Sequence, residues 1–369
     1  MMKTFLIPAK YNEIQIGELL DRLPYISENI TGVEYNSTNK TINIYLQDET
    51  YLSFLEDGLK DIEDNIEILR VAKQRIIKDN TVSDNLQAKT EVKETKSFYT
   101  EIEMILMERL DNILLKIAKG NEAINRQYPS LLTEEAMDRC QYHKSFPQNV
   151  YSLFHIPHDF RIIEQIRKES EGLPFPAFVP AGIYLRPCIC YHVYEELAQQ
   201  PVNEFIIYTS RGQCFRHEVA WKTNDFRKTE FTMREIVFVG HREQVESFRN
   251  QLMDEIWNLF EKLGLHGKLL TARDPFFHYD DLKTKGAFQA MANAKYELEF
   301  ISNAGNTFSI ASFNNCGDMI CQKYGITDTS QEYLYSGCIA FGLDRWKEAI
   351  CDVYGDNEAD WPSLLKNLN

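Results

Sequence analysis

The chain has 369 residues, of which 44% are hydrophobic, 26% charged and 12% aromatic, a composition typical of a globular protein with a substantial core. Its 17 glycines and 12 prolines exclude a collagenous or low-complexity chain. Fifty-five acidic against 40 basic residues give a net charge of −15, which disfavours a protein whose main task is to neutralise a nucleic-acid backbone.

Features of targeting are missing from the sequence. No run of 18 apolar residues predicts a membrane span, and the start of the chain lacks the small-residue cleavage site of a signal peptide. Eight cysteines are few for a disulfide scaffold of this length. We therefore expect a cytoplasmic protein whose cysteines are free thiols or metal ligands.

The first 48 residues predict a small β-α-β-β module. Alternating apolar residues indicate strands, and the helix has an apolar face with a spacing of three and four residues. The predicted elements are a strand at Lys3–Pro8, a helix at Ile14–Leu23, and strands at Gly32–Asn36 and Thr41–Leu46.

Two longer helical patterns follow, at residues 50–78 and 98–118. The first carries a heptad-like apolar seam, which needs a partner helix. Its members are Leu52, Leu55, Leu59, Ile62, Ile66, Leu69 and Ile76. Residues 79–96 are polar and without periodicity, which indicates a flexible connection. We therefore predict a helical hairpin over residues 49–125, with core packing as the role of the apolar stripes.

From Tyr128 onward, short apolar runs alternate with turn residues, and residues 126–369 are predicted to form one catalytic domain. Many strands with few intervening helices favour a mainly antiparallel sheet and an α+β fold class. Strands are predicted at 181–184, 204–209, 230–239, 296–301 and 307–313, and helices at 242–263 and 344–354. The sequence contains no G-x-G-x-x-G or Walker loop, so it does not indicate a Rossmann or P-loop nucleotide-binding fold.

The most informative segment is the run Phe215-Arg216-His217-Glu218. On a strand, Arg216 and Glu218 would lie on the same face, because side chains alternate. A guanidinium suits a phosphate, and a carboxylate accepts hydrogen bonds from an amino group such as that of adenine. A surface ion pair is the plainer alternative for this segment on its own.

Two later segments strengthen the functional interpretation. In the strand at 230–239, Phe231, Met233 and Glu235 share one face, and Phe231 offers a ring on which a purine can stack. The apolar run at 335–342 ends in Gly342 and opens a helix with Arg345 in its first turn. A cation there is poorly matched to the helix dipole, so we expect Arg345 to face an anion.

In this order, the three segments resemble motifs 2 and 3 of the class II aminoacyl-tRNA synthetases. Within that superfamily the chain is similar to the seryl-tRNA-synthetase-like amino acid:carrier-protein ligases over about residues 128–355. The segments that carry this likeness are 132–137 with 144–148, a predicted strand at 190–194, 214–218 and 311–314. The resemblance implies an antiparallel sheet flanked by helices, and a homodimer.

The resemblance also implies a reaction. A small amino acid would be activated with ATP and Mg²⁺ to an aminoacyl-adenylate and then transferred to the phosphopantetheine thiol of a carrier protein. Arg216 would hold the α-phosphate, Glu218 the adenine amino group and Phe231 the adenine ring, while Arg345 would bind the γ-phosphate and the leaving pyrophosphate. This chemistry needs positioning and positive charge rather than a covalent nucleophile.

A zinc ion belongs to the same resemblance, with Cys190, Glu235 and Cys338 at the ligand positions. Three ligands leave one tetrahedral position for the substrate α-amino group. Cysteine spacing alone would not reveal this site. Cys188, two residues before Cys190, is expected to point to the opposite face and is assigned to packing.

The amino-acid pocket would include Glu235, Asn314 and Asp318. Cys316 stands where the resemblance leads us to expect a histidine, so the identity of the amino acid is open.

Two alternatives remain at this point. A seryl-type tRNA synthetase or tRNA-modifying relative fits the predicted N-terminal hairpin, although the acidic charge of that region makes tRNA an unlikely partner. A catalytically silent regulator or binding protein is disfavoured, because Arg216, Glu218 and Arg345 are all retained. The sequence has no HxxxH pair and no Ser-His-Asp set to support a hydrolase.

Overall fold

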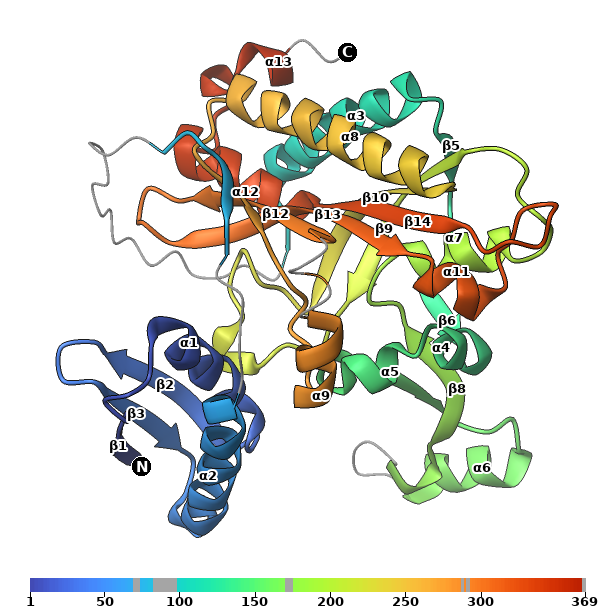
Figure 1. Cartoon of the computed structure of the whole chain (residues 1–369). Helices are drawn as coiled ribbons and strands as arrows, with labels where there is room; N and C mark the ends of the chain where they lie inside the picture. Colours follow the sequence, from blue (N-terminus) through green and yellow to red (C-terminus); the bar gives the residue numbers. More distant parts are fainter. Residues whose placement is uncertain (69–73, 82–97, 170–174, 287–288, 290–292, 367–369) are drawn as a thin grey trace.

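The computed structural model describes residues 1–68, 74–81, 98–169, 175–286, 289 and 293–366 (Figure 1). Within them the chain forms one eight-stranded sheet flanked by helices and two three-stranded sheets, which confirms the predicted α+β class. None of the described helices is long and apolar enough to cross a membrane.

The N-terminal module has the predicted β-α-β-β order. Its antiparallel sheet runs β1-β3-β2, and α1 starts at a capping box in which Asn12 and Gln15 satisfy each other's backbone N–H groups. The elements are β1 (Met2–Leu6), α1 (Glu13–Arg22), β2 (Ile30–Asn36), β3 (Thr41–Leu46) and α2 (Leu52–Ile68). The apolar stripe of α2, including Leu55 and Ile66, is buried against Leu19 and Ile44 of this module.

The prediction that residues 49–125 form a helical hairpin is wrong for the described part of the chain. Helix α3 (Glu101–Gly120) lies at the opposite end of the molecule from α2 and packs on the large sheet (Figure 1). The seam of α2 finds its partner in the N-terminal module instead. The first helix also ends well before residue 78, because Ile76–Asp79 forms the edge strand β4; Leu69 and residues 82–97 of the predicted connection lie outside the described residues.

The large sheet is antiparallel throughout except for its last pair, β9 with β5. Its strands, in sheet order, are β4 (Ile76–Asp79), β11 (Gly267–Thr271), β12 (Lys295–Ile301), β13 (Thr307–Gly317), β14 (Tyr335–Gly342), β10 (Glu230–Gly240), β9 (Ile206–Phe215) and β5 (Ile124–Arg126). One face is covered by α3, α8 (Arg242–Lys262) and α12 (Leu343–Tyr354), which together form the main hydrophobic core.

The other face of the sheet carries smaller elements and a second core. They are β6 (Leu131–Thr133), α4 (Glu134–Cys140), α5 (Tyr142–Ser145), β7 (Ser152–His155), α6 (Phe160–Glu169), β8 (Val179–Leu185), α7 (Cys190–Leu197), α9 (Tyr279–Asp281) and α11 (Met319–Tyr324). Helix α13 (Ser363–Lys366) lies near the C-terminus on the first face, where Leu365 joins the main core. The segment 190–194, predicted to be a strand, is the first part of helix α7. Cys188 therefore lies in the loop that precedes this helix.

A buried ion pair fastens α3 to the central strand β10. Arg234 and Asp111 are 3% and 5% exposed, and the Arg234 Nη2 atom donates to Asp111 Oδ2 at 2.9 Å. Arg234 alternates with Glu235 on β10, so this pair fixes the strand from the face opposite to Glu235.

We expect Asp111→Ala to lower the free energy of unfolding by about 3–5 kcal/mol, because it leaves the Arg234 guanidinium buried and uncompensated. Urea unfolding monitored by circular dichroism measures this change. The matched control is Glu108→Ala on the same helix, which removes an exposed partner of Arg211 and should cost less than about 1 kcal/mol. Equal losses in the two variants would contradict the expectation.

Candidate active site

A cavity of about 1310 Å³ opens on the face of the large sheet opposite to α3 and α8. Strands β10 to β14 supply its floor, and α1, α7 and the loop after β11 supply its walls. The predicted site residues on this cavity are Cys190, Arg216, Glu218, Phe231, Glu235, Asn314, Cys338 and Arg345. Asp318, which precedes α11, is not among the residues that line the cavity.

Arg216 lies at one end of the cavity, directly after β9. Its guanidinium is 5.2 Å from the centre of the Phe231 ring, and its Nη2 atom donates to the Pro187 carbonyl at 3.4 Å. The buried Nε atom has no hydrogen-bond partner among the described residues. A buried donor without a partner is costly, so an acceptor from a ligand would complete this group.

Arg345 approaches Arg216 from the first turn of α12. Its Nε and Nη1 atoms donate to the carbonyls of Phe226 at 2.6 Å and Ser309 at 2.7 Å. Burial, and next the charge of Arg216, lower the pKa of Arg345 to about 10. Arg216 and Arg345 are neighbouring cations that repel each other. A polyanion bound between them would offset this repulsion, so the pair forms a site for such a ligand.

Helix α12 is held at its start by Asp344. The Asp344 Oδ2 atom accepts from the backbone N–H of Thr232 on β10 at 2.6 Å, and Oδ1 accepts from the hydroxyl of Tyr99. These bonds connect the strand that carries Phe231 to the helix that carries Arg345. Phe231 and Arg345 are therefore positioned by one buried carboxylate.

The strand argument for Glu218 is wrong in detail, because β9 ends at Phe215 and Glu218 lies in the following loop. The loop still returns Glu218 to the cavity, where its Oε2 atom accepts from Arg227 Nε at 2.6 Å. The Arg216 backbone N–H donates to Thr229, so the chain stays paired for one residue beyond the strand. Arg216 and Glu218 thus reach the same cavity through the loop rather than through strand alternation.

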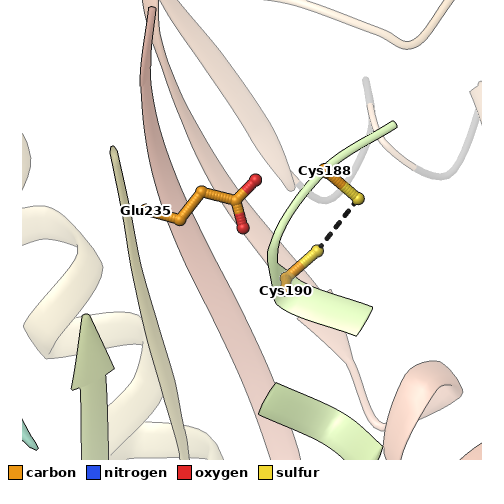
Figure 2. A group of neighbouring side chains, drawn as sticks. All are labelled: Cys188, Cys190 and Glu235. Atoms are coloured by element: carbon orange, nitrogen blue, oxygen red, sulfur yellow. Dashed lines mark hydrogen bonds between the residues drawn. The ribbon is translucent and has the colours of Figure 1, made fainter. Parts of the chain in front are cut away.

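Glu235 and two cysteines form a compact group of ligand atoms at the other end of the cavity (Figure 2). The Glu235 carboxylate, the Cys188 thiol and the Cys190 thiol lie within 4.8 Å of one another. Glu235 Oε1 accepts from the Ile189 backbone N–H at 3.3 Å, whereas the buried Oε2 atom has no partner among the described residues. Burial raises the pKa of Glu235 to about 8, with Cys338 adding to the shift.

Cys338 joins this group from β14 through Cys190. Hydrogen bonds with the thiols of Cys190 and Cys316 hold the pKa of Cys338 well below its usual range. Asn314 Nδ2 also reaches the Cys338 sulfur at 3.5 Å. Several thiols and a buried carboxylate with an unpartnered oxygen are a donor set that suits zinc. Of the predicted ligands, Cys190 and Glu235 lie in the compact group, whereas Cys338 lies outside it and contacts Cys190.

The prediction that Cys188 points away from Cys190 is wrong, although Cys188 does pack against the second core. Because Cys190 begins a helix, Cys188 lies in the loop before it, and its sulfur is 3.4 Å from that of Cys190 (Figure 2). Residues two apart share one face even on a strand, so the opposite direction has no basis in strand alternation.

A buried lysine in the cavity was also missed. Lys295 is 8% exposed, forms an ion pair with Asp274, and lies 3.1 Å from Glu297. Lys295, Glu297 and Glu299 occupy one face of β12, an interior strand of the sheet. Charges repeated on one face of an interior strand are the sequence signal that could have located this part of the cavity.

The N-terminal module forms part of the cavity wall through α1. Arg22 donates to the carbonyls of Phe277 at 2.6 Å and Phe276 at 3.2 Å, and its guanidinium lies 3.9 Å from the centre of the Tyr279 ring. Glu18 forms an ion pair with Arg273 on the same loop. The module and the large sheet therefore enclose one common cavity.

Comparisons with known proteins give a consistent result. Residues 181–354 match the family model described as the tRNA synthetase class II core domain (G, H, P, S and T). Amino acid–[acyl-carrier-protein] ligases 1 and 2 of Bradyrhizobium diazoefficiens are 27% and 26% identical to this chain; each alignment covers 71% of the chain, and they cover 81% and 79% of the two relatives. The type-2 serine–tRNA ligase of Methanococcus maripaludis is 26% identical over 65% of this chain, which covers 49% of that relative.

Among solved structures, the seryl-tRNA synthetase of M. kandleri, crystallised in complex with A. aeolicus tRNASec, matches with a TM-score of 0.70. That match covers 99% of this chain and 76% of the synthetase chain at 18% identity. The cytoplasmic serine–tRNA ligase of Naegleria fowleri in complex with AMP gives a TM-score of 0.60 over 86% of this chain and 73% of its own. At these identities the two structures establish the fold alone.

Proposed function

We propose that this chain, whose residues 181–354 form a tRNA synthetase class II core domain, is an amino acid:carrier-protein ligase. It activates a small amino acid with ATP and transfers the aminoacyl group to the phosphopantetheine thiol of a carrier protein. The observation that carries this proposal is a single cavity with two half-buried arginines at one end and a thiol–carboxylate group at the other. The similarity to two acyl-carrier-protein ligases supports the choice of acceptor.

The nucleotide end of the cavity would bind ATP with its Mg²⁺. Arg216 holds the α-phosphate, and Arg345 holds the γ-phosphate and then the leaving pyrophosphate. Phe231 stacks on adenine, and Glu218 accepts from the adenine amino group while it keeps Arg227. The amino-acid carboxylate attacks the α-phosphorus, so the two guanidiniums act where negative charge develops.

The other end of the cavity would bind the amino acid. Cys190, Glu235 and Cys338 would hold a zinc ion, and the Lewis acidity that it would supply at this end of the cavity would favour α-amino acids over plain carboxylic acids. Asn314 lies beside Cys338 and can orient the substrate. Asp318 does not line the cavity, so any contribution that it makes to the amino-acid pocket would be indirect.

A seryl-type tRNA ligase is the second candidate, favoured by the similarity to the type-2 serine–tRNA ligase of Methanococcus maripaludis. The net charge of −15 weighs against it, because tRNA presents a long polyanionic surface. Amino-acid-dependent exchange of pyrophosphate into ATP, measured for all twenty amino acids, tests the activation step that both candidates share. The absence of exchange with every amino acid would refute both.

The acceptor separates the two candidates. We expect the activated amino acid to be transferred to a phosphopantetheinylated carrier protein as a thioester, which neutral hydroxylamine cleaves rapidly. Charging of total tRNA should stay at the level of a reaction without enzyme, since the acidic surface offers little for counterion release. Incubation of the enzyme with radiolabelled amino acid and each acceptor measures this difference. A ribonuclease-sensitive product, with no thioester, would establish the tRNA ligase instead.

A further inference from the structure

The thiol of Cys188 has no role in the function proposed above, although it lies in the tightest group of ligand atoms in the described chain. Its sulfur is 3.4 Å from the Cys190 sulfur, and both sulfurs lie within 4.8 Å of a Glu235 carboxylate oxygen (Figure 2). Two thiolates on one tetrahedral zinc, each about 2.3 Å from the metal, lie about 3.8 Å apart. The observed spacing is therefore close to that of a pair of ligands.

The backbone around Cys188 is anchored on both sides. The Ile189 N–H donates to Glu235 Oε1 at 3.3 Å, and the Pro187 carbonyl accepts from Arg216 Nη2 at 3.4 Å. The segment 187–189 thus bridges the proposed metal ligands and the arginine proposed to hold the α-phosphate. Cys188 itself is half-buried, so its side chain can leave the group toward the cavity.

We propose that Cys188 is a fourth, exchangeable zinc ligand, bound when the amino-acid site is empty and displaced by the α-amino group of the substrate. This inference rests on the zinc site of the proposed function. In the exchange, the bond between Cys188 and the metal breaks and a bond to the amine nitrogen forms. The incoming ammonium loses one proton and the departing thiolate gains one, so charge and protons balance without another reactant.

A displaceable thiolate has a consequence for the nucleotide end of the cavity. When Cys188 leaves the metal, the segment 187–189 is free to shift. Such a shift would change the hydrogen bond from Arg216 to the Pro187 carbonyl. Binding of the amino acid would then be linked to the position of the α-phosphate cation.

Cys316 is the competing candidate for an additional thiolate. Like Cys338, it lies outside the compact group formed by Cys188, Cys190 and Glu235. Its thiol contacts that of Cys338, whereas the Cys338 thiol contacts that of Cys190, a member of the group. Cys316→Ala is therefore the matched control for Cys188→Ala, because each variant removes one thiol beside one of the proposed ligands.

The test replaces zinc with Co²⁺ in the full-length protein and measures the near-ultraviolet absorption of cobalt–thiolate charge transfer, calibrated per bound thiolate. We expect three thiolates in the wild type and in Cys316→Ala, and two in Cys188→Ala, a fall in absorption of about one third. Adding the amino acid that supports pyrophosphate exchange should lower the wild-type signal by the same third and leave Cys188→Ala unchanged.

Each other outcome is decisive. Two thiolates in both the wild type and Cys188→Ala, or a loss confined to Cys316→Ala, would overturn the role of Cys188 while leaving the zinc site intact. Three thiolates that persist with the amino acid would overturn the exchange. A protein that binds no cobalt would instead refute the zinc site of the proposed function.

Discussion

Arg216→Ala is expected to lower the rate of pyrophosphate exchange by about 10²–10³-fold, because it removes a preorganised cation at the point where charge develops on the α-phosphate. The Arg216 guanidinium is half-buried, has a buried, unpartnered Nε atom and lies against Phe231. Its loss should leave the metal content and the unfolding transition near those of the wild type, since the Pro187 carbonyl is the only hydrogen-bond partner of this side chain among the described residues.

Two further variants interpret the result. Arg216→Lys keeps a positive charge but not the planar fork, so we expect an intermediate rate. Arg242→Ala removes an exposed arginine paired only with Glu246 on α8 and should leave the rate unchanged. Exchange at a near wild-type rate in Arg216→Ala would exclude Arg216 as the α-phosphate ligand and remove the main support for the nucleotide end of the cavity.

Cys190→Ser is expected to lose zinc and amino-acid activation together. Wild-type protein purified without chelator should contain about one zinc per chain, as one site with three protein ligands requires. Loss of a thiolate ligand should weaken zinc binding by more than about 100-fold, since losing even a hydrogen-bond partner of a ligand costs 10–100-fold. Metal analysis by inductively coupled plasma mass spectrometry and pyrophosphate exchange measure the two effects.

Cys338→Ser should behave in the same way, because its thiol contacts that of Cys190, and this contact lowers the pKa of Cys338 well below its usual range. Cys351→Ala provides the control: this cysteine is equally buried but belongs to the core between α8 and α12. It should keep both zinc and activity. Metal-free wild-type protein with full activity would show that the thiols serve another purpose.

The sequence predicts the elements of this fold better than their partners. The stripe on α2 is apolar at helical spacing, and Leu55, Leu59 and Ile62 are indeed buried. Periodicity predicts that a helix face will be buried, but not which element will cover it. The face of α2 packs on the module of β1–β3, whereas α3 packs on the large sheet through its own apolar stripe and through Asp111. Partner choice depends on the whole core, which a local pattern does not contain.

Local sequence patterns likewise place only some of the site residues correctly. Phe231 and Glu235 are correctly placed on one face because they lie within a long strand, where alternation holds over many residues. Arg216 and Cys188 lie at the ends of elements, where the side-chain direction is set by loop conformation. Lys295 is not predicted from the sequence as a cavity residue, because a lone lysine normally indicates a solvent-exposed position. Its burial is tolerated because it forms ion pairs with Asp274 and Glu297.

The wall that α1 contributes to the cavity carries a thermodynamic consequence. A ligand stabilises every part of the chain that must be folded for it to bind, and here that includes a module whose own core is centred on Ile44. Occupancy of the cavity would slow amide hydrogen exchange in β1–β3 as well as in the large sheet. Conversely, a substitution at Ile44 that loosens the module would weaken ligand binding at a distance, through a larger population of molecules in which Arg22 has left the carbonyls of Phe276 and Phe277.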